Sequence, residues 1–212
     1  MALSRRDFLG LGSFLLVACG SGATRRDAGA ARMVPTPRVD DGDDDAPPPI
    51  AAASCGAATA SNIEGPFYKQ GAPHRAILVT ERDPGERFTV SGTVLSTSCE
   101  PIANAELDIW HADARGAYDL DGYHFRGALI TDANGRFELQ TIIPGRYLNG
   151  DTYRPAHVHV KARARGHRTL TTQLYFEGDP YNDSDPFIVE SLIMHHRKQH
   201  GIHRATFDFI LA

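Results

Sequence analysis

Long apolar runs, concentrated basic charge and helix-type periodicity are all scarce in this sequence of 212 residues. No apolar run reaches the roughly 18–20 residues that a membrane-spanning helix needs, which excludes a helical membrane span. The formal net charge of −4 argues against nucleic acid as a partner, because phosphate binding needs a concentrated basic face. Few segments have helical spacing, whereas 13 prolines and 20 glycines interrupt the chain, and this composition favours β structure.

The first 18 residues are interpreted as a targeting segment. Arg5 and Arg6 precede an apolar stretch, residues 8–18, whose length suits the central region of a signal peptide. The arginine pair resembles a twin-arginine export signal, with an ordinary basic signal-peptide start as the alternative. Leu16 to Cys19 resembles a lipobox. We therefore expect residues 1–18 to be removed and the protein to be exported as a lipoprotein, anchored to a membrane through acylated Cys19, in the periplasm or on the outer cell surface.

Residues 19–53 are expected to be a disordered tether. They are rich in Ala, Gly and Pro and contain an acidic run from Asp40 to Asp45, so they lack the apolar surface that would offset the entropy lost on ordering. With Cys19 acylated, Cys55 and Cys99 remain as a pair in an oxidising compartment. We expect a disulfide between them; two buried free thiols are the alternative.

Residues 54–212 are expected to form one all-β domain, a β-sandwich of short, mostly antiparallel strands with long loops that carry the site. Seven segments have the composition and turn boundaries of strands: 87–95, 105–111, 125–131, 136–142, 156–164, 169–176 and 203–211. Only residues 189–198 have a helical pattern, and it is weak. The alternation in residues 105–111 leaves open which face of that strand is buried.

The most informative stretch is 144–159, Pro-Gly-Arg-Tyr-Leu-Asn-Gly-Asp-Thr-Tyr-Arg-Pro-Ala-His-Val-His. His157 and His159 lie two apart on an expected strand, so both imidazoles project from the same face. Arg154 precedes them, and Tyr147 ends a Pro-Gly-Arg-Tyr turn. These side chains indicate a metal site with a neighbouring cation. The alternative is a partly exposed histidine pair and a tyrosine that packs in a turn.

Six motifs follow one another in a specific order along the domain. They are Glu64-Gly65-Pro66-Phe67-Tyr68, Gly116-Ala117-Tyr118, Phe125-Arg126-Gly127, Pro144-Gly145-Arg146-Tyr147, Arg154-Pro155-Ala156-His157-Val158-His159 and Gln173-Leu174-Tyr175-Phe176. This set resembles the intradiol ring-cleavage dioxygenases, non-haem ferric enzymes that include the protocatechuate and catechol dioxygenases. The resemblance runs from about Cys55 to the C-terminus and is greatest to exported, single-domain members. Soluble catechol enzymes carry a helical N-terminal region used in dimer formation, whose place is taken here by the targeting segment and tether.

The resemblance implies an iron(III) ion bound by Tyr118, Tyr147, His157 and His159. It also implies that Arg154 stabilises negative charge on the substrate ring and that Gln173 adds a hydrogen bond nearby. These residue types suit the ion, because hard phenolate oxygens favour Fe(III), whereas two histidines and a carboxylate are typical of ferrous oxygenases. The ordinary pKa of a phenol is near 10, so a tyrosine ionises at neutral pH only beside a strong local cation, which a ferric ion supplies.

The implied reaction cleaves a catechol-type ring between its two hydroxyl-bearing carbons, using O2, to give a cis,cis-muconate-type diacid. The alternative function is a non-catalytic, transthyretin-like β-sandwich that serves as a binding or scaffold module, although such a module has no need for all four ligands. The remaining histidines are not expected to form a second metal site, and His195 and His196 are expected to be solvated. The residues define neither the particular catechol nor the oligomeric state.

Overall fold

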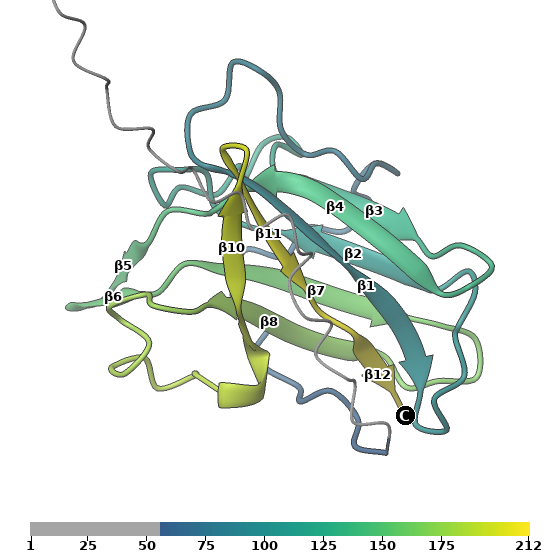
Figure 1. The fold of residues 1–212 in the computed structure, drawn as a ribbon. Helices are drawn as coiled ribbons and strands as arrows, with labels where there is room; N and C mark the ends of the chain where they lie inside the picture. Colours follow the sequence, from purple (N-terminus) through teal and green to yellow (C-terminus); the bar gives the residue numbers. More distant parts are fainter. Residues whose placement is uncertain (1–55) are drawn as a thin grey trace, which may run out of the picture. The chain divides into compact units, whose positions relative to one another are not determined.

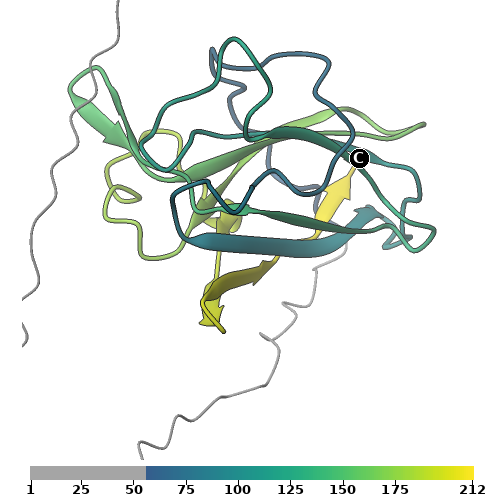
Figure 2. The ribbon, with the colours of Figure 1, turned by 90° about the horizontal axis from the view of Figure 1, so that it is seen from above.

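Two five-stranded sheets and a short hairpin make up the computed structural model, which describes residues 56–212 (Figures 1 and 2). The first sheet has the order β10 (His196–Gln199), β11 (Ile202–Thr206), β1 (Arg87–Ser96), β12 (Phe209–Leu211), and β4 (Arg136–Ile142) pairs with β1. The second has the order β3 (Arg126–Ile130), β2 (Glu106–Trp110), β7 (His157–Arg163), β8 (Leu170–Phe176), β9 (Ile193–Met194). The hairpin consists of β5 (Tyr147–Asn149) and β6 (Thr152–Arg154).

The predicted all-β class is confirmed. Of the nine strand pairings, six are antiparallel, and β1 pairs in parallel with β11 and β12, as β8 does with β9. The targeting segment, acylated Cys19, the tether and Cys55 lie outside the described residues, so the predictions made for them, including the Cys55–Cys99 disulfide, stay predictions. Among the described residues, no helix has the length and apolar character needed to cross a membrane.

The two sheets share one apolar core, and their strands show how each sheet faces it. Strand β4 alternates buried and exposed residues, because one of its faces is covered and the other meets solvent. Strand β7 is buried almost throughout: Val158, Val160 and Ala162 join the core, so the intervening His157 and His159 project from the opposite face. Residues of the two sheets meet directly, as in the rings of Phe88 and Phe176, whose centroids lie 4.9 Å apart.

The face of the second sheet that points away from this core is covered by the chain before β1. Thr172 donates a hydrogen bond to the carbonyl of Ala60, at 2.8 Å, and Tyr68 donates one to the carboxylate of Asp108, also at 2.8 Å. Both faces of β2 are therefore buried, which explains why its alternation in the sequence did not reveal a single buried face. This covered polar face of β2, β7 and β8 carries the candidate site.

The helix predicted for residues 189–198 is wrong. A short 3-10 turn, η1 (Glu190–Leu192), is followed by β9 and β10. The burial of Leu192 and Met194 follows the two-residue period of a strand. β9 pairs with β8 and β10 pairs with β11, and these tertiary pairings override a weak local helical preference.

The strand predicted for residues 203–211 is interrupted. The backbone of Phe207 and Asp208 leaves the strand geometry between β11 and β12, but it stays bound to β1: Phe207 N donates to Ser91 O at 2.9 Å, and Thr93 N donates to the carboxylate of Asp208 at 2.7 Å. Gly92 allows this close approach, because a Cβ at that position would lie 1.9 Å from the carbonyl oxygen of Phe207.

Gly92→Ala is therefore expected to lower the free energy of unfolding by about 3 kcal/mol, since the added methyl group meets backbone atoms that cannot rotate away. The measurement is urea unfolding followed by circular dichroism. Ser91→Ala is the control, because it changes the residue next to Gly92 without adding an atom. A loss of less than about 1 kcal/mol for Gly92→Ala would contradict a rigid contact between β1 and residues 207–208.

Candidate metal centre

The two histidines of the His-x-His motif are held side by side by the register of the second sheet. His159 stands opposite Trp110 on β2 and Gln173 on β8, and His157 stands opposite Tyr175. The rings of His157 and His159 have their centroids 4.8 Å apart, and both residues are buried. The ring of Trp110 stacks on His159 at 4.7 Å with an interplanar angle of 6°, which fixes the plane of that imidazole.

Tyr118 reaches the same place from the loop between β2 and β3. The carboxylate of Asp113 accepts hydrogen bonds from the backbone N–H groups of Arg115 and Ala117, at 2.8 and 2.9 Å, so the loop turns tightly before the tyrosine. Gly116 within this turn has a φ of +87°, a value that favours glycine.

Two glycines bring the tyrosine-bearing segments together. A Cβ on Gly116 would lie 2.2 Å from the carbonyl oxygen of Arg146, and a Cβ on Gly145 would lie 2.4 Å from the backbone nitrogen of Gly116. The Gly-x-Tyr and Pro-Gly-x-Tyr motifs therefore contact each other through their glycines. This contact positions Tyr118 and Tyr147 with their ring centroids 5.7 Å apart.

The four side chains converge on one point. The hydroxyl oxygen of Tyr118 lies 3.3 Å from Nε2 of His157 and 3.1 Å from Nε2 of His159. The ring of Tyr147 lies 5.6 Å from that of His157, centroid to centroid. Phe67 closes the site from the N-terminal segment, stacked on Tyr118 at 4.3 Å. The structure thus brings together all four residues that the sequence proposed as ligands.

The protonation states of these groups suit a cation. Nδ1 of His157 lies 2.7 Å from the carbonyl oxygen of Pro155 and donates its proton there, so Nε2 is left with a free lone pair that faces Tyr118. Burial lowers the pKa of His157 to about 3 and that of His159 well below its usual range, so both imidazoles are neutral. Burial also raises the pKa of the Tyr118 and Tyr147 hydroxyls above the usual range.

Two buried phenols and two neutral imidazoles fit a hard, highly charged cation. Such an ion supplies the positive charge that would ionise both phenols against the effect of burial. Among residues 56–212, no three His, Cys, Asp or Glu side chains gather closely enough to hold a metal ion. The tyrosine–histidine donor set matches the preference of Fe(III) for phenolate oxygen.

Arg154 and Gln173 border the convergence point, where the sequence placed them. Both are buried, and Nη2 of Arg154 donates to Oε1 of Gln173 at 2.8 Å. Nη1 of Arg154 lies 3.5 Å from the hydroxyl of Tyr147, its register partner across the hairpin. Gln173 in turn donates to the carbonyl of Ile63 at 2.8 Å. The guanidinium therefore points a donor at the tyrosine hydroxyl next to the site.

Three further residues of the site were given no role in the sequence analysis. Asp185 forms an ion pair with Nε of Arg154, and the hydroxyl of Tyr175 donates to Gln173 at 3.0 Å. Phe67 covers Tyr118. Asp185 lies outside the motifs and the expected strands, and Phe67 and Tyr175 lie in motifs but had no assigned role. Their function depends on contacts between distant parts of the chain.

Several histidines outside the site have other partners. His111 is buried, with Nδ1 2.7 Å from the carbonyl of Ala112 and Nε2 2.7 Å from the hydroxyl of Thr141. His195 is exposed, as expected, and pairs with Glu177 at 2.9 Å. His196 is not simply solvated: it is half-buried, and its Nδ1 lies 3.0 Å from Nδ1 of His203.

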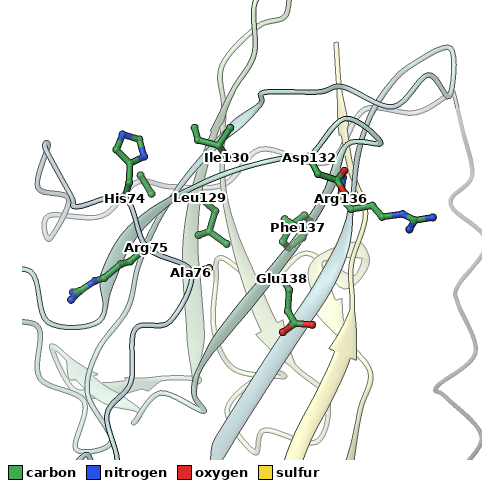
Figure 3. Close-up of a pocket in the computed structure, with 10 residues that line it drawn as sticks. His74, Arg75, Ala76, Leu129, Ile130, Asp132, Arg136, Phe137 and Glu138 are labelled. Atoms are coloured by element: carbon green, nitrogen blue, oxygen red, sulfur yellow. The ribbon is translucent and has the colours of Figure 1, made fainter.

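A hollow of about 380 Å³ lies elsewhere on the domain, between β3, β4 and residues 74–76 (Figure 3). Its lining includes Arg75, Ile130, Asp132 and Glu138, and none of its residues belongs to the tyrosine–histidine cluster. The candidate chemistry is therefore not in this hollow.

The fold and the site define a class: an all-β protein in which two tyrosines and two histidines form a buried metal-type cluster beside an arginine. The protein-family model described as "Dioxygenase" matches residues 63–212. The chain belongs to the intradiol ring-cleavage dioxygenase family.

Individual relatives agree with this assignment. The chain is 39% identical over 153 residues to a chlorocatechol 1,2-dioxygenase of Rhodococcus opacus, a match that covers 60% of each chain. It is 35% identical over 160 residues to a catechol 1,2-dioxygenase of Acinetobacter baylyi, covering 64% of this chain and 51% of that enzyme. This chain thus matches only about half to three fifths of the length of these curated relatives.

A solved structure resembles this protein over nearly the whole length of the solved domain. It is the dioxygenase domain of a dioxygenase–carbohydrate-binding protein fusion from Streptomyces sp. SirexAA-E, with a TM-score of 0.69 and 44% sequence identity. The match covers 73% of this chain and 98% of that domain. The sandwich therefore corresponds to a dioxygenase unit that occurs as a separate domain.

Proposed function

We propose that this protein is a non-haem iron(III) intradiol dioxygenase. Its substrates would be a catechol-type aromatic and O2, and its product a cis,cis-muconate-type diacid that contains both oxygen atoms. The observation that carries this proposal is the approach of the Tyr118 hydroxyl to within 3.3 Å of the Nε2 atoms of His157 and His159. The names of the relatives, catechol and chlorocatechol 1,2-dioxygenase, support the substrate class.

The four ligand candidates would have different tasks. His157 and His159, fixed by β7 and by the stack on Trp110, would hold adjacent positions on the ion. Tyr118 is wedged between both histidines and Phe67 and would remain bound. Tyr147 lies on the short β5–β6 hairpin, which projects from one side of the two sheets in both views (Figures 1 and 2). When bound, ferric iron would supply the Lewis acidity that draws electron density from a bound catechol.

Arg154 would act on the substrate itself. In this buried site a fixed guanidinium stabilises negative charge strongly, because little water is present to screen it. Its Nη1 faces the hydroxyl of Tyr147, which places the positive charge beside the space where the ring would bind. Gln173 fixes the other end of the guanidinium through Nη2. Phe67 and the N-terminal segment cover the cluster and would exclude water from it.

The experiment is an assay of the purified protein supplied with ferrous salt in air. We expect about one iron per chain, a visible absorption band from tyrosinate-to-iron charge transfer, and O2 uptake with catechols together with absorbance of a muconate-type product. A panel of catechol, chlorocatechols and hydroxyquinol would identify the preferred ring. A colourless protein that binds no iron would contradict the proposal and favour the scaffold alternative.

A further inference from the structure

The loop that follows β8 carries two buried carboxylates, and each pairs with an arginine that flanks the β5–β6 hairpin. The Asp179 carboxylate accepts from Nε of Arg146 at 2.8 Å, and the Asp185 carboxylate accepts from Nε of Arg154. Both aspartate side chains are nearly inaccessible, at 2% and 0% exposure, but their partners differ: the Arg146 side chain is 46% exposed and the Arg154 side chain 5%. Only the second pair is enclosed with the candidate site.

Asp185 is held rigidly by its own loop. Its second carboxylate oxygen accepts a hydrogen bond from the backbone N–H of Phe187 at 2.7 Å, and its backbone N–H donates to the carbonyl of Tyr181 at 3.0 Å. Its carboxylate is therefore satisfied on one side by the loop and on the other by Arg154. A carboxylate fixed in this way sets the direction of the N–H that it binds.

The remaining groups around Arg154 use other parts of the guanidinium. Nη2 donates to Gln173, and the ring of Phe187 lies against the guanidinium, with its centroid 4.7 Å from the central carbon. Because Nε is bound by Asp185 and Nη2 by Gln173, the plane of the group is determined, and Nη1 is left to face Tyr147 at 3.5 Å. Without Asp185, the guanidinium would keep one short hydrogen bond, to Gln173, and the longer contacts with the hydroxyls of Tyr175 and Tyr147 at 3.4 and 3.5 Å, so its direction would be less firmly fixed.

We propose that Asp185 is a positioning residue for the ring-cleavage reaction, which acts by aiming Nη1 of Arg154 at the reacting ring. The inference rests on the proposed dioxygenase function and on the assigned role of Arg154. Asp185 does not itself reach the cluster of tyrosines and histidines; it acts through the arginine. A fixed donor matters because small displacements of a catalytic group reduce its effect on the transition state.

The test is a double-mutant cycle on the iron-loaded full-length protein, using Arg154→Ala, Asp185→Asn and the double variant. Asp185→Asn should lower kcat about tenfold, with KM within about threefold of the wild-type value, because a transition-state interaction is weakened. Iron content and the charge-transfer band should be unchanged. In the Arg154→Ala background, Asp185→Asn should change kcat less than about twofold, since the residue through which it acts is gone.

Asp179→Asn is the matched control. It makes the same chemical change in the same loop at a similarly buried carboxylate. Its arginine is half-exposed, and among the described contacts the guanidinium of Arg146 makes no hydrogen bond to Gln173 or to the hydroxyl of Tyr147. Both carboxylates accept a backbone N–H on the oxygen that does not bind the arginine, from Tyr181 at 3.0 Å for Asp179 and from Phe187 at 2.7 Å for Asp185, so the amide disturbs the two loop positions in the same way. Its kcat should stay within about threefold of the wild-type value.

Equal effects of Asp185→Asn on kcat with and without Arg154 would overturn the positioning role. If Asp185→Asn fails to fold or to bind iron, Asp185→Glu serves instead: it keeps the charge but moves the carboxylate, and an unchanged kcat would then overturn the proposal. Failure of the proposed function looks different, because wild-type protein would then show neither iron colour nor O2 uptake. The same cycle measured by urea unfolding reports the Asp185–Arg154 interaction without using activity, and additive effects there would also count against it.

Discussion

Arg154→Ala is expected to lower kcat by about 10²–10³-fold while iron stays bound, the scale typical of removing one preorganised donor from a developing charge. The guanidinium contacts Tyr147, Gln173 and Asp185 but is not itself a ligand candidate, so its loss should leave the four donors in place. KM should change much less than kcat, because the charge that the arginine stabilises develops only during the reaction.

The measurements are iron per chain, the charge-transfer band, and steady-state O2 uptake with the preferred catechol. Arg136→Ala is the control: this arginine is exposed on β4 and borders the hollow away from the site, so its loss should leave kcat unchanged. Wild-type turnover in Arg154→Ala would remove the assigned role. Loss of iron from the folded variant would instead make Arg154 a structural support of Tyr147.

The local features of the fold could be predicted from the sequence. The Asp-Ala-Asn-Gly sequence 132–135 is typical of a hairpin turn, and it does form a turn, because its hydrogen bonds close within a few residues. The hairpin itself is wrong: the turn joins β3 to β4, which lie in different sheets and pair with β2 and β1. The His-x-His pair likewise follows from the two-residue period of a strand. The helix predicted for residues 189–198 failed because a weak local preference was overridden by pairing with strands elsewhere in the chain.

The long-range features of the site could not be predicted from residue patterns alone. The contact between Gly116 and Gly145 brings together segments 29 positions apart, and Tyr118 meets histidines 39 and 41 positions away. His157, His159 and Tyr147 were singled out within the stretch 144–159, whereas Tyr118 was found only because the order of the motifs resembles a family. Asp185 was missed because nothing in its local sequence indicates that its partner is Arg154, 31 positions earlier.

His157→Ala is expected to weaken iron binding more than about 100-fold, since even loss of a group that only supports a ligand costs 10–100-fold. The charge-transfer band and catechol-dependent O2 uptake should disappear together. Nδ1 of His157 is bound to the backbone, and Nε2 is directed at the Tyr118 hydroxyl. Alanine therefore removes a metal-ligand nitrogen that no neighbouring histidine among the described residues can replace.

His111→Ala makes the same substitution at a histidine that burial alone does not distinguish from His157. Both are buried, and burial lowers the pKa of His111 to about 4 and that of His157 to about 3. The two ring nitrogens of His111, however, are bound to Ala112 and Thr141, so neither is free for a metal. His111→Ala should therefore cost about 2–3 kcal/mol of stability while the folded protein keeps its iron. The measurement is an iron titration of both variants, compared at the same fraction of folded protein. Equal loss of iron from the two variants would mean that burial of an imidazole, and not the direction of its lone pair, determines where the metal binds.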